Sequence, residues 1–583
     1  MYRSHYCGSL NAEHVDHEVL VAGWVNKYRK MGSLVFIDLR DYTGLIQLNI
    51  ADENLLSLAN ELRNEFVVNV RGTVRRRPAE MINPNMSTGE IEIDVKELTI
   101  LSKAQTPPFE IFEVDKGEAN EDLRLKYRYL DLRRDKMQKN LRFRAKMTSY
   151  IRQYMESRNY LSVETPLLTA SSPEGARDFL VPSRLYPGKF YALPQAPQQF
   201  KQLLMVAGCD KYYQIAPCFR DEDPRADRSP GEFYQLDVES SFKTKEEFFQ
   251  EMEPMFIELT EKVAGKKVWK KPFPRITFEE AMNRWGSDKP DLRFDMEIKD
   301  ITDLAKATTF SVFQNAETVR ALVIDGADQF SRSDIEGELT SLAKKHHAHG
   351  LAWLKYQAGA WSGSITKFFT EEQLNQLLDL TGASKNSLIL MVADNFLPAV
   401  KALGAIRFLM GKRLNLVDPD VLAWAWIVDF PMYEYDEDKG TWDFGHNPFS
   451  MPRGGLDALT KENIGNVIGE QYDLISNGYE LASGALRNYD PEILYKAFEL
   501  VGYDRSVVDR KFGHMIDAFK FGAPPHCGFA PGIERLTMVL MNEDNIREVV
   551  AFPKNSKAIE MLTGAPSEVD QNQLDDLHIS INK

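Results

Sequence analysis

The segment Phe219–Glu239 (FRDEDPRADRSPGEFYQLDVE) constrains the fold more than any other part of this chain. Arg220 carries a planar fork of donors that can hold two phosphate oxygens at once. Phe233 follows thirteen residues later, beyond a turn rich in proline and glycine. The spacing predicts a strand, a loop and a returning strand that bring a cation and a flat ring to one nucleotide site. An isolated arginine and phenylalanine are more often part of a charged surface hairpin, so the rest of the chain must decide.

The length of 583 residues exceeds what one hydrophobic core supports, and it predicts three or more domains. A hydrophobic fraction of 43% and a charged fraction of 27% are typical of an ordinary globular protein. The chain has no apolar run long enough to cross a bilayer and no signal-peptide pattern at its start, so we expect a cytoplasmic protein. Four cysteines without CxxC spacing predict free, mostly buried thiols (Cys7, Cys209, Cys218 and Cys527).

The net charge of −15 disfavours a polyanionic partner at first sight, but local charge matters more than the sum. Basic residues gather at Lys27–Lys30, at Arg75–Arg77 and most densely at Arg124–Lys136. Because the Debye length is about 8 Å at physiological salt, each patch acts almost independently of distant acidic surface. Each patch alone is also compatible with a solvated face.

The region from Val19 to about Leu101 reads as five short strands separated by turn residues. Alternation is clear at Ile91, Ile93 and Val95. Five such strands fit a small barrel of the OB type, which binds single-stranded nucleic acid by stacking bases on exposed aromatic rings. Phe36 lies in the second of these strands and could stack on a base, but a phenylalanine taken alone is more often a core residue.

Three later segments mark the organisation of the rest of the chain. Ala104–Ile111 is a proline-marked linker, and apolar residues at helical spacing predict a helix over Lys146–Arg158. From about Gly286, roughly 130 residues lack nucleotide-type motifs until Trp424–Pro431 restarts a buried strand, which implies an inserted domain. Inside it, the histidines of Lys344–Gly350 lack a carboxylate or thiolate at ligand spacing and favour a solvated helix end over a metal site.

Three segments in order resemble the signature motifs of the class II aminoacyl-tRNA synthetases. Phe219–Glu239 resembles motif 2, and Gly528–Met541 resembles motif 3, a glycine-rich strand that leads into a helix. The helix over Lys146–Arg158, followed by a strand that ends at Pro166, resembles motif 1. The chain departs from the class pattern at Ala530-Pro531, as the aspartate subgroup also does.

Four further segments resemble the bacterial-type aspartyl-tRNA synthetases, and the likeness covers essentially the whole chain. These segments are Ser171–Ser183, Gln195–Leu204, Gly286–Arg293 and Phe444–Phe449. The resemblance implies an α+β multidomain fold: an OB-fold anticodon-binding barrel, a class II antiparallel-sheet catalytic domain flanked by helices, and an inserted α+β domain of the GAD type. The implied boundaries are 1–105 for the barrel, 106–135 for the hinge, 136–285 and 419–560 for the catalytic domain, 286–418 for the insertion and 561–583 for a C-terminal extension.

The resemblance implies that aspartate and ATP form aspartyl-adenylate, whose aspartyl group is then transferred to tRNA(Asp). Such chemistry needs alignment and cations rather than a side-chain nucleophile, since the substrate carboxylate is already ionised. Arg220 and Arg535 are the implied catalytic residues, at the α- and γ-phosphates. The implied ATP-binding residues are Arg220, Asp221, Glu222, Phe233, Glu480, Gly532, Ile533, Glu534 and Arg535. Asp473 and Glu480 are the implied Mg²⁺ ligands, although an acidic pair at this spacing is usually a surface face.

Selection of aspartate over asparagine is implied to rest on fixed cations. Arg487 and Lys201 would pair with the side-chain carboxylate, whereas an amide would leave buried donors unpaired. Gln198 and Asp237 would hold the ammonium, His446 would lie over the amino acid, and Glu174 would act as a mobile lid residue. The implied aspartate-binding set is Glu174, Gln198, Lys201, Arg220, Asp237, His446 and Arg487. An isolated arginine such as Arg487 is more commonly part of a surface ion pair.

The family positions also imply an anticodon site, a dimer and a question of tRNA choice. Phe36 and Gln47 are implied to grip an anticodon base, with Arg29 and Glu92 as weaker candidates. The motif 1 helix and strand imply a homodimer interface, with an ordinary core helix as the alternative. Relaxed bacterial relatives carry His-Gly-Gly where this chain has Met31-Gly32-Ser33, which favours strict use of tRNA(Asp).

Two rival functions stay open at this point. An asparaginyl- or lysyl-tRNA synthetase shares the architecture, but Arg487, Lys201 and the inserted domain oppose it. A catalytically silent tRNA-binding relative is opposed by the presence of Arg220, Arg535, Asp473 and Glu480.

Overall fold

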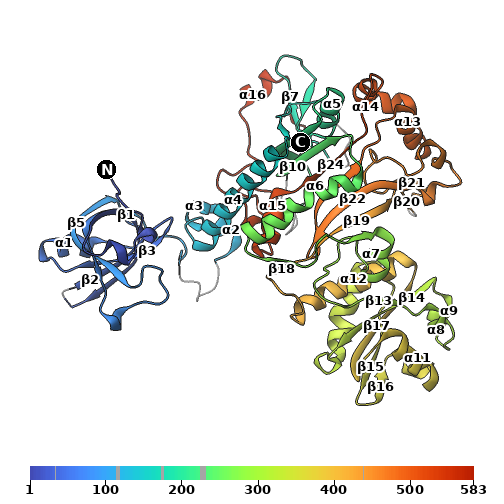
Figure 1. The fold of residues 1–583 in the computed structure, drawn as a ribbon, viewed down its shortest axis with the longest axis horizontal. Helices are drawn as coiled ribbons and strands as arrows, with labels where there is room; N and C mark the ends of the chain where they lie inside the picture. Colours follow the sequence, from blue (N-terminus) through green and yellow to red (C-terminus); the bar gives the residue numbers. More distant parts are fainter. Residues whose placement is uncertain (33, 113–118, 172–175, 224–230, 437–438, 583) are drawn as a thin grey trace. The chain divides into compact units, whose positions relative to one another are not determined.

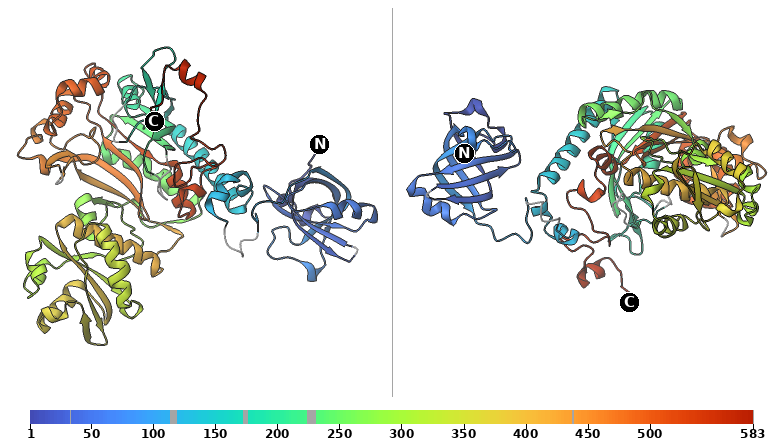
Figure 2. Two further views of the ribbon diagram at one scale, coloured as in Figure 1. Left: turned by 180° about the vertical axis from the view of Figure 1, so that it is seen from behind. Right: turned by 90° about the horizontal axis from the view of Figure 1, so that it is seen from below.

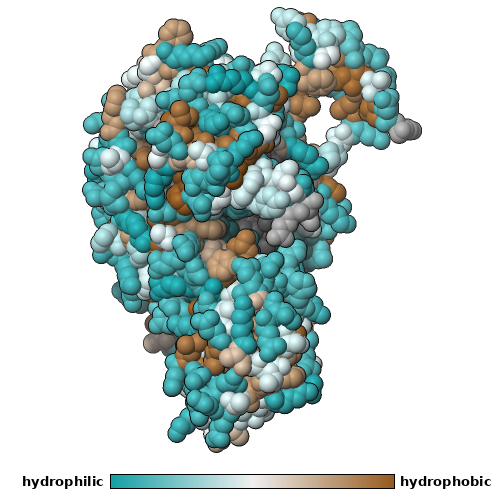
Figure 3. Space-filling view, turned by 90° about the vertical axis from the view of Figure 1, so that its right-hand side faces the viewer, coloured by the Kyte–Doolittle hydropathy of each residue, from teal (hydrophilic) through white to brown (hydrophobic). Residues whose placement is uncertain are grey.

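The computed structural model describes residues 1–32, 34–112, 119–171, 176–223, 231–436 and 439–582. The chain forms two compact units, Met1–Arg142 with Ala551–Pro566, and Phe143–Val550 with Ser567–Lys583. No helix in the described part of the chain is long and apolar enough to span a membrane. The face of the molecule in Figure 3 is mainly hydrophilic, with only scattered apolar patches.

The first unit contains the predicted five-stranded barrel, drawn in blue in Figures 1 and 2. Its strands are β1 (Glu18–Met31), β2 (Leu34–Asp41), β3 (Gly44–Ile50), β4 (Val67–Arg76) and β5 (Ile91–Ser102), which close in the order β1-β2-β3-β5-β4. The alternating apolar positions fill the barrel, as with Val35, Ile37 and Leu39 on β2. Helix α1 (Glu53–Glu61), which the alternation pattern did not reveal, begins where the Asp52 side chain accepts from the Asn54 N–H.

Two short helices follow in the same unit, α2 (Glu121–Lys126) and α3 (Arg128–Asp131). Asp131 is fully buried and accepts from Arg124 at 2.9 Å, Arg128 at 2.5 Å and Arg134 at 3.3 Å. Burial opposes the charge of this carboxylate, but the arginines outweigh it and hold the pKa of Asp131 below its usual value. Part of the predicted basic segment therefore forms ion pairs within α2, α3 and the residues that follow, instead of facing solvent.

The second unit is built on an eight-stranded sheet in the order β12-β19-β22-β23-β24-β10-β9-β6. The strands are β6 (Leu161–Ser162), β9 (Lys211–Arg220), β10 (Gly231–Ser241), β12 (Arg275–Thr277), β19 (Trp424–Pro431), β22 (Ile468–Ser476), β23 (Tyr479–Leu486) and β24 (His526–Pro531). Helices α6 (Lys245–Glu258) and α15 (Ile533–Met541) lie along the sheet (Figure 1). Aromatic packing fills the core beneath it, with Phe249 stacked on Trp426 at 4.0 Å between ring centroids.

The predicted strand, loop and returning strand of Phe219–Glu239 are β9 and β10, which pair in antiparallel register with Arg220 opposite Gly231. The predicted motif 1 helix lies inside α4 (Asp135–Ser157), which begins eleven residues before the predicted start at Lys146. The strand after it has only two residues, Leu161 and Ser162. Residues 130–145 carry charges on most helix faces, so apolar spacing alone could not locate the start of α4.

The region predicted as an insertion holds a second sheet in the order β13-β14-β17-β15-β16. Its strands are β13 (Ile298–Asp300), β14 (Thr318–Asp325), β15 (Ala352–Gln357), β16 (Ala360–Gly363) and β17 (Asn386–Asp394). Helix α12 (Phe396–Arg413) packs on β14 and β17. The histidine-rich segment follows α10 (Thr340–Lys345), and the described residues contain no cluster of three or more metal-type ligands. The four cysteines are free thiols, and three of them are buried.

Candidate active site

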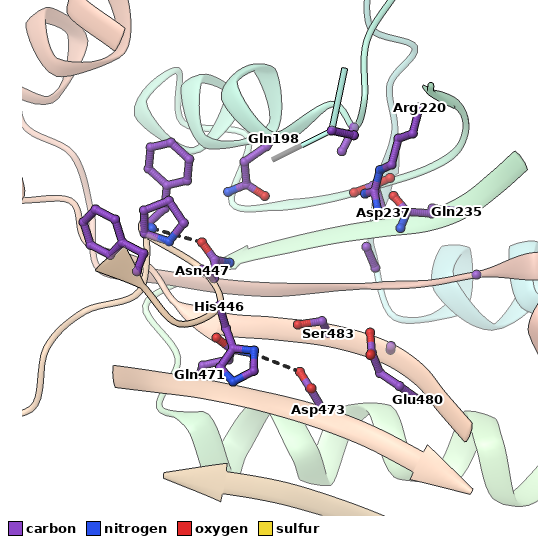
Figure 4. Close-up of a pocket in the computed structure, with 18 of the residues that line it drawn as sticks. Gln198, Arg220, Gln235, Asp237, His446, Asn447, Gln471, Asp473, Glu480 and Ser483 are labelled. Atoms are coloured by element: carbon purple, nitrogen blue, oxygen red, sulfur yellow. Dashed lines mark hydrogen bonds between the residues drawn. The ribbon is translucent and has the colours of Figure 1, made fainter. Parts of the chain in front are cut away.

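A cavity of about 1040 Å³ lies on the eight-stranded sheet of the second unit. Its walls come from β9, β10, β22, β23, the start of α15, helix α5 (Gln198–Val206) and the loop 443–449. Among the residues that line it are the predicted Gln198, Lys201, Arg220, Glu222, Phe233, Asp237, His446, Asp473, Glu480, Arg487, Gly532, Glu534 and Arg535. Segments far apart in the sequence therefore meet in one cavity, as Figure 4 shows for ten labelled side chains.

Arg220 and Phe233 lie side by side at the end of the β9–β10 pair. The Arg220 guanidinium lies 5.1 Å from the centre of the Phe233 ring. Its Nε donates to the Gln195 carbonyl at 3.3 Å, which orients the fork. Asp221 does not line the cavity: its half-exposed carboxylate pairs with Arg177 at 3.4 Å. A cation next to an aromatic face is the arrangement that the sequence predicted for a phosphate and a purine.

Arg535 reaches the same cavity from the first turn of α15. Its Nη1 donates to the Glu480 carbonyl at 2.7 Å, which ties the guanidinium to β23. Ile533 packs in the core, while Gly532 caps the helix and lines the cavity. Both oxygens of Glu534 are engaged, by Arg144 at 2.5 Å and by the Tyr234 N–H at 3.0 Å. Burial raises the pKa of Glu534 despite the nearby Arg144.

Four charged side chains, each no more than 2% exposed, form the deepest part of the site. Lys201 Nζ lies 2.9 Å from Asp237 Oδ1 and 3.7 Å from Glu239 Oε2. Arg487 holds Glu239 with two bonds, of 2.8 Å and 3.2 Å. Burial opposes the charge on Glu239, but Arg487 and Lys201 outweigh it and keep its pKa below the usual value. Two cations and two anions thus neutralise each other in a buried pocket.

One polar atom of this cluster has no hydrogen-bond partner among the described residues. It is Oδ2 of Asp237, which is buried and belongs to a residue that lines the cavity. An unpaired buried carboxylate oxygen costs free energy until a donor reaches it. Gln198 also lines the cavity, and its amide donates to Gln202 at 3.0 Å. The pocket therefore presents a vacant acceptor for a cationic or amino group.

An acidic pair lies on β22 and β23, across the hairpin turn Asn477-Gly478. Positive φ angles at Asn477 (54°) and Gly478 (90°) close this turn, so Asp473 and Glu480 are on adjacent strands and not on a helix. Burial, Glu480 and Asp288, in that order, raise the pKa of Asp473 well above its usual value. Carboxylates that repel each other in this way fit a divalent cation, and Mg²⁺ needs only one or two protein carboxylates besides phosphate and water.

Several residues of the cavity were not predicted from the sequence. Gln235 lies between Phe233 and Asp237 on the same face of β10, and the period of two along a strand could have indicated it. Asp288 belongs to the segment Gly286–Arg293, which carried the resemblance but received no role. Glu239, the partner of Arg487, continues the same alternation on β10 and is fully buried, although it does not line the cavity.

The predicted anticodon residues lie on one face of the barrel in the first unit. Arg29 donates to Asp38 at 2.7 Å and to Gln47 at 3.1 Å. Gln47 in turn donates to the buried carboxylate of Glu92 at 2.7 Å, and Phe36 is half-buried beside them on β2. Met31 is exposed at the end of β1. Glu174 and Ser33 lie outside the described residues.

Comparison with protein families gives two matches. The family of class II tRNA synthetases (D, K and N) matches residues 120–556, which is most of the chain. The OB-fold nucleic acid binding domain matches residues 19–101, which is the barrel.

Curated relatives are similar over the full chain. An aspartate–tRNA(Asp/Asn) ligase of Chlorobium phaeobacteroides (strain BS1) is 47% identical and covers 100% of this chain and 96% of its own length. An aspartate–tRNA ligase of Streptomyces avermitilis is 48% identical and covers 100% of this chain and 99% of its own length.

Solved structures share the fold at low sequence identity. An asparaginyl-tRNA synthetase from Pyrococcus horikoshii complexed with asparaginyl-adenylate is 19% identical with a TM-score of 0.58, over 95% of this chain and 98% of that one. A putative aspartyl-tRNA synthetase from Leishmania major Friedlin is 20% identical with a TM-score of 0.59, over 95% and 94%.

Proposed function

Since the chain belongs to the aspartate–tRNA ligase family of the class II tRNA synthetases, we propose that it activates L-aspartate with ATP and transfers it to the 3′ end of tRNA(Asp). It is an aminoacyl-tRNA ligase, and ATP is the co-substrate of this enzyme class. The observation that carries the choice of amino acid is the buried set of Lys201, Asp237, Glu239 and Arg487 in the cavity.

The first step joins the aspartate α-carboxylate to the α-phosphorus of ATP. A carboxylate oxygen forms the new bond, the bond to the bridging oxygen breaks, and pyrophosphate leaves. We assign Arg220 to the α-phosphate, Phe233 to the purine face and Arg535 to the γ-phosphate end, with Glu222 on the nucleotide side. Because these cations are held before substrate arrives, they stabilise developing charge without reorganising. In the second step the ribose 3′-hydroxyl oxygen attacks the carbonyl carbon of the adenylate. AMP leaves, and solvent takes the proton of the hydroxyl group.

Aspartate would bind with its ammonium on Asp237 Oδ2 and its side-chain carboxylate between Arg487 and Lys201. The vacancy on Asp237 supports the first contact, and the buried guanidinium and ammonium support the second. Asparagine would point NH₂ donors at groups that can only donate, so it would be rejected. We also assign His446, Gln198 and the lid residue Glu174 to the amino-acid site.

Asp473 and Glu480 are the residues that would hold Mg²⁺. When bound, the ion would neutralise phosphate charge that the arginines leave uncompensated. Burial and, after it, the charge of Glu480 raise the pKa of Asp473, and this supports the assignment because a bound cation would offset both.

The barrel is proposed as the anticodon-binding domain, with Arg29, Phe36, Gln47 and Glu92 as the contact residues. The hydrogen-bonded chain from Arg29 to Glu92 supports a base-reading surface, because it holds donors and acceptors in fixed directions. We propose Met31 as a determinant of strict tRNA(Asp) use. The variant Met31→His combined with Ser33→Gly is expected to raise charging of purified tRNA(Asn).

We further propose a cytoplasmic homodimer with the domain division inferred from the sequence. Exposed apolar side chains gather where the residues after β6 meet the hairpin of β7 (Leu180–Pro182) and β8 (Phe190–Ala192), and the pairing of Thr169 with Ala192 joins the two segments. They are Leu161, Leu167, Leu168, Leu180, Leu185, Tyr186, Phe190 and Tyr191. A surface of this kind supports burial against a second copy. Sedimentation of wild type and Leu168→Asp tests it, with a monomeric variant expected.

Amino-acid-dependent exchange of labelled pyrophosphate into ATP tests the proposed reaction. Aspartate alone should drive exchange, and asparagine and lysine should not. Charging of purified tRNA(Asp) and tRNA(Asn) then tests the acceptor. Exchange driven by asparagine or lysine, or absent with every amino acid, would reject the proposal.

A further inference from the structure

The segment Gly286–Met296, which links α7 (Phe278–Trp285) to the inserted sheet, carries Asp288 into the active-site cavity. Gly286 has a φ of +66°, and a Cβ there would lie 2.0 Å from the Val400 carbonyl of α12, so only glycine fits this close approach. The inserted domain therefore begins against the wall of the active site.

Helix α12 of the inserted domain fixes this segment through one buried arginine. Arg407 Nε donates to the Met296 carbonyl at 2.7 Å, and Nη2 donates to the carbonyls of Asp291 and Phe294, both at 2.9 Å. Each bond satisfies a backbone acceptor, so the segment has little freedom to move independently of α12.

Lys289 follows Asp288 and lies beside the acidic end of the cavity, where its ammonium pairs with this cavity-lining carboxylate. Its Nζ lies 3.3 Å from the carboxylate of Asp288, and its charge also interacts with Glu480 and Asp473. Partial burial opposes the ammonium, but these carboxylates outweigh it and the pKa of Lys289 lies above its usual value. On the other side of Glu480, Arg535 holds the backbone carbonyl. Lys289 and Arg535 therefore approach Glu480 from two different domains.

We propose that Lys289 neutralises the pyrophosphate portion of ATP at the acidic end of the cavity. Three carboxylates without a resident cation would repel a polyphosphate, and a compact ammonium on a flexible stem suits a single phosphate oxygen. The role rests on the proposed function, in which pyrophosphate takes part in the activation step only. Loss of Lys289 should therefore impair activation and spare the transfer of aspartate to tRNA.

The test compares Lys289→Met with Lys299→Met. Both lysines belong to the inserted region, their side chains are 42% and 40% exposed, and each pairs with one neighbouring carboxylate, at 3.3 Å and 3.2 Å. The carboxylate paired with Lys289, that of Asp288, lines the active-site cavity, whereas Glu297, the partner of Lys299, does not. Binding of inorganic pyrophosphate with Mg²⁺ is measured by calorimetry, activation by pyrophosphate exchange, and transfer by a single turnover from preformed aspartyl-adenylate.

Lys289→Met should weaken pyrophosphate binding about tenfold, which corresponds to about 1.4 kcal/mol, and should slow exchange by at least as much. Transfer should stay within about twofold and the melting temperature should match that of Lys299→Met, because an exposed side chain contributes little to stability. Lys289→Arg should keep most of the affinity. Arg407→Lys, which loosens the segment, should show a weaker form of the same pattern.

Unchanged pyrophosphate affinity in Lys289→Met would overturn the proposal. So would equal losses in exchange and transfer, because those would indicate a general structural role. If wild type binds pyrophosphate but aspartate drives no exchange, the proposed reaction fails, and the affinities of the two lysine variants still decide the role of Lys289.

Discussion

The two ends of the active-site cavity differ in how their charged residues are arranged: one end pairs opposite charges, and the other brings like charges together. At the amino-acid end, Lys201 and Arg487 each pair with a buried carboxylate at 2.9 Å and 2.8 Å, so the charges are compensated before any ligand arrives. At the end proposed for the polyphosphate, Asp473 and Glu480 lie on adjacent strands, and burial and then the charge of Glu480 raise the pKa of Asp473. We propose that the first end recognises one amino acid, whereas the second needs Mg²⁺ and neighbouring cations to accept a polyphosphate.

The largest effect is expected from Arg487→Leu at the compensated end. It leaves Glu239 buried without its bidentate partner, which costs about 3–5 kcal/mol of stability, and it removes the proposed carboxylate contact. Aspartate-dependent exchange should fall by at least about a thousandfold, a barrier increase of about 4 kcal/mol. Thermal unfolding and exchange kinetics measure the two losses.

Arg453→Leu is the matched control for that variant. Arg453 is 46% exposed and pairs with Asp429 and Glu470, and both of those carboxylates keep Lys245 as a partner. The change should alter stability by no more than about 1 kcal/mol. Near-normal exchange in Arg487→Leu would show that the buried pair is only structural.

A smaller loss of activity, without a loss of stability, is expected from Asp473→Asn at the acidic end of the cavity. Exchange should fall about a hundredfold, or about 2.7 kcal/mol in the barrier, with a changed Mg²⁺ dependence. Stability without metal should equal or exceed that of wild type, because the substitution removes a buried like-charge interaction. Asp544→Asn, at a carboxylate that is 89% exposed, serves as control and should change neither quantity. A marked fall in the melting temperature of Asp473→Asn would contradict the contrast between the two ends.

A variant in the barrel tests whether this domain affects the charging of tRNA without affecting the activation of aspartate. Glu92→Gln weakens the contacts with Gln47 and Arg75, at 2.7 Å and 2.9 Å. Charging of tRNA(Asp) should fall about tenfold, or about 1.4 kcal/mol, while pyrophosphate exchange stays at the wild-type rate. Glu97→Gln, on the same strand but 69% exposed, should leave both rates unchanged. A fall in exchange for Glu92→Gln would mean that the barrel also affects activation.

The smallest effect is a dependence of stability on pH in the absence of metal. For a carboxyl with a raised folded pKa, the folded state binds more protons than the unfolded state between the two pKa values. The contribution of Asp473 to the free energy of unfolding therefore falls as pH rises above the usual value of 3.8. Glu239 acts in the opposite sense: its contribution is present above 4.5 and is lost as pH falls through its lowered pKa.

Denaturant unfolding with excess EDTA measures this dependence. The stability advantage of Asp473→Asn over wild type should grow with pH by up to about 1.4 kcal/mol per pH unit until the folded pKa of Asp473 is passed. Saturating Mg²⁺ should stabilise the wild-type protein and so reduce the stability advantage of the variant. A constant difference at every pH would show that the folded state does not raise the pKa of Asp473.

Much of the fold could be predicted from local patterns. Short runs separated by turn residues located the five barrel strands, and Arg220 with Phe233 indicated the β9–β10 pair that the register confirms. Boundaries were less accurate: α4 begins at Asp135, well before its apolar stripe. The spacing of Asp473 and Glu480 left a helix and a strand-like turn open, and the structure has a hairpin that turns at Asn477-Gly478. Charged helix turns carry no apolar signal, and a seven-residue spacing fits a helix as well as a hairpin.

The roles assigned to individual site residues remain predictions. Residue type in Phe219–Glu239 indicated a planar cation for phosphate and a flat ring for a purine, and the family resemblance added the second arginine and the carboxylate pair for a metal. These requirements depend on residue type, which the sequence gives directly. The pairing of Arg487 with Glu239, the vacancy at Asp237 Oδ2 and the pairing of Lys289 with the cavity residue Asp288 became visible in three dimensions. Each of these features depends on which side chains meet after distant strands pair, and burial sets the strength of the interaction between them.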